Sequence, residues 1–213
     1  MCQFPTDTLR CIALRVLILH GWQGSQGPHW QRWLAPELRA AGCVVRFPEL
    51  PDPMTPDLTA WRSTLDAELR ELAADDGERL VVCHSLGCIL WLHHAASMTS
   101  DAPRVDRVLL NAPPGPLGEL PTFFPVPVDP AGVAAAATTT RLVCSDDDPY
   151  CPQGGKPTYA DPLGIPCDLL PGQGHLNVDA GYGPWPAMLD WCLGGRDDLV
   201  AFDQSGTKNG ADA

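Results

Sequence analysis

The stretch Val82-Cys83-His84-Ser85-Leu86-Gly87 decides the fold, because it joins an aliphatic run at residues 79–83 directly to an apolar helical pattern at residues 86–96. A serine between a buried strand and a helix is typical of the G-x-S-x-G turn, in which the serine backbone is strained and its hydroxyl is exposed. Cys83 stands in place of the first glycine, while Gly87 stands where the second is expected. Such strain costs about 1–3 kcal/mol and needs small neighbours. The alternative is an ordinary loop serine followed by a helix.

Outward from this turn, short apolar runs alternate with helical patterns along the chain. Such alternation is typical of an α/β fold with a mostly parallel central sheet and helices on both of its faces. The expected strands are residues 12–19, 43–47, 79–83, 105–111, 141–144 and 167–170. The expected helices are residues 28–41, 86–96 and 185–193, together with one that begins at Thr55-Pro56 and ends at Gly77.

The chain has 213 residues, a length that fits one domain. We expect that domain to span residues 1–193. Residues 194–213 are polar and rich in Gly and Asp, so we expect them to form a flexible C-terminal tail. Residues 113–130 contain seven prolines and are too short for a large cap domain, which makes them a loop or a short lid.

Charge and hydropathy exclude several classes of function. The chain carries 26 acidic and 14 basic residues, for a formal net charge of -12, which argues against nucleic acid and against an anionic membrane surface as partners. No apolar run approaches the roughly 20 residues that span a bilayer. The first residues hold no Lys/Arg-flanked apolar stretch with a cleavage site, so we do not expect secretion. We therefore expect a cytoplasmic protein. Its nine scattered cysteines are expected to be free thiols, because a reducing compartment disfavours disulfides.

A carboxylate for the serine is expected directly after the fifth strand, in the stretch Cys144-Ser-Asp-Asp-Asp-Pro-Tyr-Cys-Pro152. Side chains at the carboxyl end of a parallel strand face the crevice where such proteins bind ligands. Asp148 is the first choice because the Asp-Pro-x-x-Pro sequence rigidifies the turn behind it; Asp147 is second and Asp146 third. The alternative is a solvated acidic turn.

A base is expected directly after the sixth strand, in Gly172-Gln173-Gly174-His175. The two glycines let this loop bend back over the sheet. An unperturbed imidazole has a pKa of about 6.5, so His175 can take the hydroxyl proton near neutral pH and return it to a leaving group. A loop histidine alone is more often structural, but the chain order Ser85, Asp148, His175 is that of the α/β-hydrolase triad.

Backbone donors for an oxyanion are expected in His20-Gly-Trp-Gln-Gly-Ser25, directly after the first strand. Acyl transfer at a serine needs N–H groups aimed at the developing negative charge. We expect one donor to be the N–H of Leu86, which follows the nucleophile, and the other to be that of Trp22, with Gly21 next. The alternative is a tight glycine-rich turn in which Trp22 serves only packing.

Four segments together resemble the small serine hydrolases of the YdeN-like family, also called the retinoblastoma-binding-protein-nine-like family. They are His20-Gly-Trp-Gln-Gly-Ser25 with His29-Trp30, Cys83-His-Ser-Leu-Gly87, Asp147-Asp-Pro-Tyr150 and Gly174-His175. The resemblance runs to about Leu193 and implies a compact α/β-hydrolase fold without a large cap domain. It also implies a triad of Ser85, Asp148 and His175, with the acid directly before the proline. One branch of this family is named for binding a partner protein.

These expectations combine into a serine hydrolase that cleaves an ester or related acyl bond of a small, uncharged substrate, with neither a metal nor an organic cofactor. A catalytically weak protein-binding module on the same scaffold is the alternative, although no protein partner is indicated. An acyltransferase or peptidase would use the same residues. Aromatic residues near the motifs are expected to line the substrate pocket: Trp22, Trp30, Phe123, Phe124 and Tyr150.

Overall fold

The computed structural model of this chain describes residues 14–99, 102–118, 120 and 122–199. Six strands form one sheet in the order β2-β1-β3-β4-β5-β6, and every neighbouring pair is parallel. The strands are β1 Arg15–Leu19, β2 Val44–Arg46, β3 Arg79–His84, β4 Val105–Asn111, β5 Ala137–Cys144 and β6 Cys167–Leu169.

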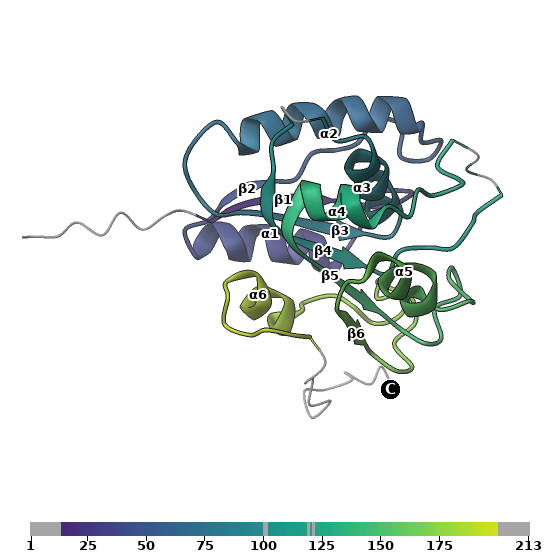
Figure 1. Cartoon of the computed structure of the whole chain (residues 1–213). Helices are drawn as coiled ribbons and strands as arrows, with labels where there is room; N and C mark the ends of the chain where they lie inside the picture. The colour runs from purple at the N-terminus through teal and green to yellow at the C-terminus, as the bar shows by residue number, and fades with distance from the viewer. Residues whose placement is uncertain (1–13, 100–101, 119, 121, 200–213) are drawn as a thin grey trace, which may run out of the picture.

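Helices cover both faces of this sheet: in Figure 1 α2 and α3 lie above it, and α1 and α6 lie below. Helix α4, drawn in front of the strands, packs against α3 on the same face as α2. The α/β architecture predicted from the sequence is confirmed, and no large cap domain is present in the described part of the chain. The helices are α1 Trp30–Ala40, α2 Leu58–Leu72, α3 Leu86–Ala96, α4 Pro130–Ala136, α5 Asp161–Leu163 and α6 Pro186–Cys192, with a π-helical turn η1 at Lys156–Ala160.

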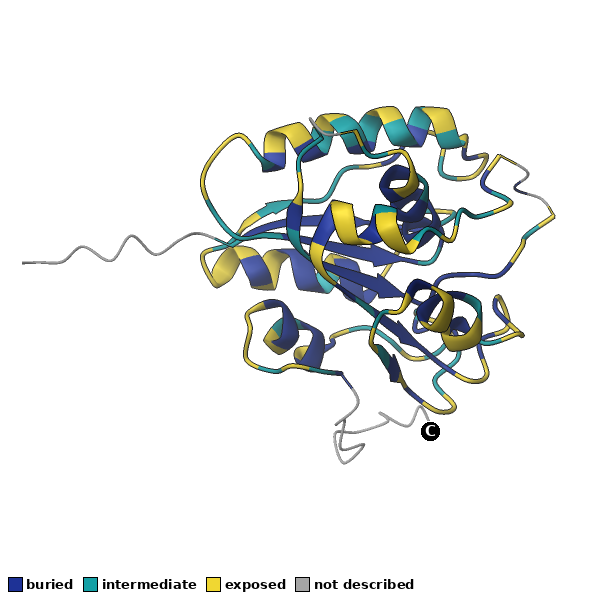
Figure 2. Ribbon diagram, in the orientation of Figure 1, coloured by how far each residue is buried: buried dark blue, intermediate teal, exposed yellow. Residues whose placement is uncertain are grey.

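Each face of the sheet has its own apolar core, because successive strand residues point to opposite faces. On one face, Leu17 of β1 and Val81 of β3 pack with residues of α2, α3 and α4. On the other, Val16 and Val82 pack with residues of α1 and α6. The central strands are therefore buried on both sides (Figure 2), which explains why they read as continuous aliphatic runs rather than alternating ones.

The strand order reverses between β1 and β3, since the chain places β2 on one side of β1 and β3 on the other. Ligands of open parallel sheets bind at such a switch point, beyond the carboxyl ends of the strands. The loop after β1 and the turn after β3 both open there. The loops after β5 and β6 reach the same edge, so the topology brings four sequence motifs together.

The structure differs from the expected elements mainly between residues 129 and 163. Residues 134–140 are all Ala or Thr and hold the end of α4 and the first half of β5, so β5 begins at Ala137 rather than at residue 141. Helix α4 forms because Asp129 accepts a hydrogen bond from the Ala131 N–H and Pro130 occupies the first turn. The η1 and α5 turns were not expected from the sequence. Residues 113–129 contain neither helix nor strand where they are described.

The predicted tail falls largely outside the described residues, which end at Leu199. Leu199 itself is buried, and its N–H donates to the Asp168 carboxylate at 2.8 Å. The domain boundary at residue 193 stays a prediction. Within the described ranges, no helix combines the length and the apolar composition needed to cross a bilayer.

Candidate active site

Ser85 lies at the turn between β3 and α3, at the carboxyl edge of the sheet. Its backbone has φ 54° and ψ -123°, a conformation that residues other than glycine rarely adopt. The Ser85 N–H donates to the Asn111 carbonyl at the end of β4 (2.9 Å), which ties the strained residue to the neighbouring strand. Cys83, in the first glycine position, is wholly buried within β3. The strained turn expected from the sequence is therefore present with a cysteine in that position.

Two glycines leave the space that this turn needs. A Cβ atom on Gly87 would lie 2.8 Å from the carbonyl oxygens of both His20 and Leu19, so α3 packs directly against the end of β1. A Cβ atom on Gly21 would lie 2.6 Å from the Cβ of Ser85. The main chain of the loop after β1 therefore lies in contact with the serine.

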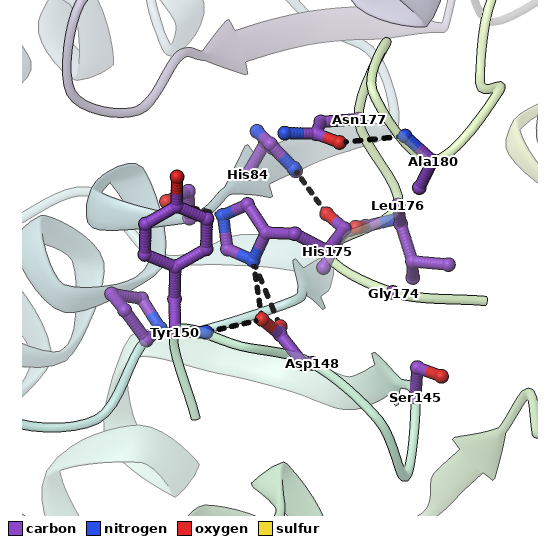
Figure 3. A network of polar contacts seen from close by, with 12 residues as sticks. His84, Ser145, Asp148, Tyr150, Gly174, His175, Leu176, Asn177 and Ala180 are labelled. Atoms are coloured by element: carbon purple, nitrogen blue, oxygen red, sulfur yellow. Dashed lines mark hydrogen bonds and ion pairs between the residues drawn. The ribbon is translucent and has the colours of Figure 1, made fainter. Parts of the chain in front are cut away.

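The imidazole of His175 links Ser85 to Asp148. Its Nε2 lies 2.9 Å from the Ser85 Oγ. Its Nδ1 lies 3.0 and 2.8 Å from the two carboxylate oxygens of Asp148, contacts that Figure 3 draws as dashed lines. Asp148 is 3% exposed and His175 is 6% exposed. A carboxylate at Nδ1 can only accept, so Nδ1 carries the proton and Nε2 is free to accept the serine O–H. This geometry suits transfer of the serine proton to the imidazole.

The three consecutive aspartates after β5 have different contacts. Asp148 alone among them contacts His175, and it also accepts from the Tyr150 N–H at 2.9 Å. The other two bind the glycines of the His175 loop: the carboxylate of Asp147 accepts from Gly174, and that of Asp146 accepts from Gly172. Hydrogen bonds from the Ser145 hydroxyl and then from the Gly174 N–H lower the pKa of Asp147. Asp146 and Asp147 thus join the acid loop to the base loop.

The N–H groups of Trp22 and Leu86 donate to no other described residue. Leu86 is the first residue of α3, where a helix leaves its N–H groups without partners. The N–H groups of the next two residues already have acceptors: Gln23 donates to the Pro53 carbonyl, and Gly24 donates to the Gly21 carbonyl. Two N–H groups without a described acceptor therefore lie near Ser85: that of Trp22 in the loop after β1, and that of Leu86 at the start of α3.

Residues 16–192 match the protein family described as Serine hydrolase. The chain belongs to this family. This serine hydrolase is 25% identical to YdeN of Bacillus subtilis (strain 168), a hydrolase by name, over 182 residues that cover 83% of this chain and 93% of YdeN.

Solved structures place this serine hydrolase in the α/β-hydrolase fold. The crystal structure of YdeN matches with a TM-score of 0.74 and 23% identity, covering 85% of this chain and 98% of YdeN. A YdeN-like hydrolase of Pectobacterium atrosepticum matches with a TM-score of 0.63 and 21% identity, over 84% of this chain and 88% of the other. A carboxylesterase structure from Nitrososphaera gargenis has a TM-score of 0.61 and 14% identity, over 86% and 89% of the two chains. The predicted family resemblance and fold are confirmed.

A cluster of buried histidines surrounds His175 of this serine hydrolase and was not anticipated from the sequence. The Nε2 of His84 lies 3.1 Å from the carbonyl oxygen of His175, and because that oxygen only accepts, Nε2 carries the proton. The ring of His29 lies 4.9 Å from that of His84. Burial lowers the pKa of His84 well below its usual range. Burial, and next the nearby imidazoles of His175 and His20, lower the pKa of His29 to about 4.

Two of these histidines anchor the loop that contacts Ser85. His29 caps α1: its Nδ1 accepts from the Gln31 N–H at 3.2 Å. His20 binds the Gly21 carbonyl through Nδ1 at 2.8 Å and accepts from the Leu50 N–H through Nε2 at 2.9 Å. In the sequence, both histidines stand close to glycines in the stretch after β1. Their positions in the sequence do not reveal which groups their rings contact.

A cavity of about 270 Å³ opens over Ser85 and His175. Of the aromatic residues expected there, Trp22 and Tyr150 line it, and the Tyr150 ring packs on His175 with 4.5 Å between centroids. Leu117 lines it from the proline-rich segment. Its other lining residues are Gln23, Gly24, Gln26, His29, His84, Asn177, Val178 and Asp179.

Three expected pocket residues do not line this cavity. Trp30 is wholly buried at the start of α1, where its indole N–H donates to the Leu176 carbonyl at 2.9 Å. Phe123 is also wholly buried and packs edge-on against Trp61 of α2, with Phe124 against the same core. Trp30 and Phe123 thus use their apolar area to hold helices on the sheet, whereas Phe124 stays partly exposed outside the cavity.

A larger cavity of about 540 Å³ lies between α2 and α3 and does not form part of this site. It contains a histidine–carboxylate contact, His94 with Asp66 at 3.3 Å. The hydroxyl of Ser97, which also lines it, donates to the main-chain oxygens of His93 and His94. Among the described residues that line this cavity, Ser97 is the one serine, and its hydroxyl is not hydrogen-bonded to an imidazole nitrogen, in contrast to Ser85.

Proposed function

We propose that this serine hydrolase cleaves ester bonds of small acyl substrates, with Ser85 as nucleophile, His175 as general base and acid, and Asp148 as the residue that orients His175. The observation that carries the proposal is the 2.9 Å contact between the Ser85 Oγ and the His175 Nε2, on an imidazole whose Nδ1 is held by a buried carboxylate. A nucleophile, a base and an orienting group within hydrogen-bond reach are the signature of covalent catalysis.

In the first half of the reaction, Ser85 attacks the ester carbonyl carbon while His175 Nε2 takes the hydroxyl proton. The tetrahedral intermediate collapses as the imidazolium returns that proton to the leaving alkoxide, and the alcohol departs. In the second half, water attacks the acyl group on Ser85 and gives its proton to Nε2. Collapse of that intermediate returns the proton to Ser85 and releases the carboxylic acid. Asp148 keeps the proton on Nδ1 and stabilises the imidazolium throughout.

The N–H groups of Trp22 and Leu86 are proposed to hold the oxyanion of both intermediates. They are free of other described partners and flank the nucleophile. Donors that already point at the developing charge need no rearrangement during the reaction, and losing one costs about 3 kcal/mol in related chemistry. Because Gly21 lies against Ser85, the main chain before Trp22 is close enough to the nucleophile for this role.

The cavity supports a small substrate. Its volume of about 270 Å³ falls just below the range of about 300–1,000 Å³ that holds drug-sized ligands. Trp22, Leu117 and Tyr150 offer apolar contact, while no Lys or Arg lines the described cavity. We therefore propose short acyl groups without negative charge. The carboxylesterase among the similar structures fits this reaction class.

The decisive experiment is labelling of the full chain by a fluorophosphonate probe, which reacts only with an activated serine. The wild type is expected to label, Ser85→Ala is expected not to, and Ser97→Ala serves as the matched control that keeps labelling. A panel of p-nitrophenyl esters of increasing acyl length then measures kcat/KM, with the maximum expected at short chains. A folded wild type that neither labels nor hydrolyses any ester would favour a protein-binding module and overturn the proposal.

A further inference from the structure

Two cysteine sulfurs are in contact at the edge of the sheet, away from Ser85. The Sγ atoms of Cys144 and Cys167 lie 3.7 Å apart, and both thiols are free. Cys144 is the last residue of β5, and Cys167 is the first residue of β6. Cys144 pairs with Leu169 in the sheet and Cys167 with Leu142, so the two cysteines are diagonal neighbours on one face. Theirs is the one sulfur–sulfur contact among the described residues.

The two thiols differ in exposure and acidity. Cys144 is 2% exposed, whereas Cys167 is partly exposed. The hydrogen bond between them raises the pKa of Cys144 and lowers that of Cys167, and the nearby Lys156 ammonium also lowers the pKa of Cys167. Burial of Cys167, and next the carboxylates of Asp168 and Asp161, act against this effect without reversing it. Cys167 is thus the more exposed and more acidic of the two thiols and the one that an oxidant can reach, with Cys144 as the resolving thiol behind it.

We propose that Cys144 and Cys167 are a modification site that forms an intramolecular disulfide with low-molecular-weight disulfides such as oxidised glutathione. The Cys167 thiolate attacks one sulfur of the oxidised glutathione, which forms a mixed disulfide and expels one glutathione thiolate. The Cys144 thiolate then attacks the Cys167 sulfur and expels the second glutathione thiolate. The two protein thiols lose two electrons and two protons, and one glutathione disulfide is reduced to two glutathione molecules.

Closing this disulfide requires β6 to move. Strands about 4.8 Å apart with a rise of about 3.3 Å per residue put diagonal Cα atoms about 8 Å apart, whereas a disulfide needs about 4.4–6.8 Å. Strand β6 has three residues and pairs only with β5 at the sheet edge, so we infer that closure moves β6 rather than β5. That movement would strain the contacts of Asp168 in β6 with the Arg141 guanidinium and with the Leu199 N–H.

The shift would reach the candidate active site through two short loops. The chain runs from Cys144 directly into the loop that carries Asp148, and from β6 into the loop that carries His175. The 2.8 Å contact between these two side chains depends on how the strands are placed. We therefore expect the disulfide to lower esterase activity by about tenfold or more, since small misplacements of catalytic groups have effects of this size.

The test is equilibration of the full chain with oxidised glutathione, followed by intact mass measurement and non-reducing peptide mapping. The wild type is expected to lose about 2 Da, for two thiol hydrogens, and to yield a peptide that joins Cys144 to Cys167. Cys144→Ser is expected to stop at a glutathione adduct on Cys167, because the resolving thiol is gone. Cys167→Ser is expected to yield no internal disulfide and no adduct on Cys144. A linkage through other cysteines, such as Cys151, or no linkage at all would overturn the proposal.

Activity gives a second readout that rests on the proposed function, whereas the mass readout does not. Ester hydrolysis by the oxidised wild type is expected to fall and to return with dithiothreitol, while the double variant Cys144→Ser/Cys167→Ser stays insensitive to oxidised glutathione. A disulfide that forms with an unchanged rate would overturn the inferred shift of β6. A wild type that forms the disulfide but hydrolyses no ester in either state would contradict the esterase proposal instead.

Discussion

The imidazole of His84 donates from Nε2 to the main-chain oxygen of His175, at 3.1 Å, so the residue before Ser85 is hydrogen-bonded to the loop that carries His175. His84 is buried apart from an edge that lines the cavity, and burial lowers its pKa well below the usual range, so the ring stays neutral. Because the ring stays neutral with its proton on Nε2, its hydrogen bond to His175 does not change through the neutral pH range. His84 therefore acts as a positioning residue, which contacts the loop of His175 rather than a substrate's reacting atoms.

Two substitutions of His84 should distinguish the effect of this hydrogen bond on activity from the effect of the ring's packing. His84→Leu removes the donor and is expected to lower kcat by about 10- to 100-fold, because His175 loses one of its anchors. His84→Gln keeps an N–H donor near the position of Nε2 and should recover part of the loss. The measurement is kcat and KM on a short p-nitrophenyl ester, with melting curves to check folding. Equal losses in both variants would show that the ring's packing matters and its donor does not.

The aspartates after β5 offer a matched pair of variants. Asp148→Asn replaces the carboxylate at His175 Nδ1 with an amide and is expected to lower kcat by about 10⁴-fold, the cost of the corresponding change in a well-studied triad. Asp147→Asn keeps an oxygen that can accept from Ser145 and Gly174, so a loss of about tenfold or less is expected. Steady-state kinetics of both variants on the same ester decide the assignment, and a larger loss in Asp147→Asn would reverse it.

The candidate triad could be predicted because each member follows a strand of a parallel sheet directly. Strand ends of such a sheet meet at one edge, so Ser85, Asp148 and His175 had to lie near one another once the strands were correct. The pocket could not be predicted in the same way. Phe123 lies in a segment without helix or strand, where no periodicity tells which way a side chain points.

Trp30 is the instructive exception among the pocket residues. It shares helical spacing with Leu34 and Leu38, and that spacing places all three on the buried face of α1. The pattern alone could have assigned Trp30 to the core. His84, by contrast, follows an aliphatic strand and carries no signal of its partner, because its contact with His175 joins residues 91 positions apart.

Gly87 should be among the positions least tolerant of a side chain. Gly87→Ala is expected to destabilise the fold by about 1–3 kcal/mol, the usual cost of overpacking, since its Cβ would meet the main-chain oxygens of Leu19 and His20 at 2.8 Å. Gly118→Ala is the matched control: no atom lies within 4 Å of its added Cβ, so a change within about 0.5 kcal/mol is expected. Urea unfolding of the two variants and the wild type gives both values. Similar losses would mean that α3 and β1 can move apart.

Acid should destabilise this protein partly through His29. Its pKa is about 4 in the folded chain, because burial and neighbouring imidazoles disfavour its charge, and about 6.5 when exposed. Between these pH values His29 is protonated in the unfolded chain but neutral in the folded chain. The free energy of unfolding therefore falls as the pH drops from about 6.5 to about 4. The contribution of His29 to this fall reaches about 3 kcal/mol at the lower end.

His29→Asn isolates that contribution, because asparagine can still cap α1 by accepting from the Gln31 N–H but does not titrate. Any packing lost with the imidazole lowers stability equally at every pH, so the slope of stability against pH is the informative quantity. Urea unfolding at several pH values between 4.5 and 7.5 should give a shallower slope for the variant than for the wild type. Equal slopes for the variant and the wild type would mean that the pKa of His29 is the same in the folded and the unfolded chain. Burial and the neighbouring imidazoles would then not disfavour the charged form of His29.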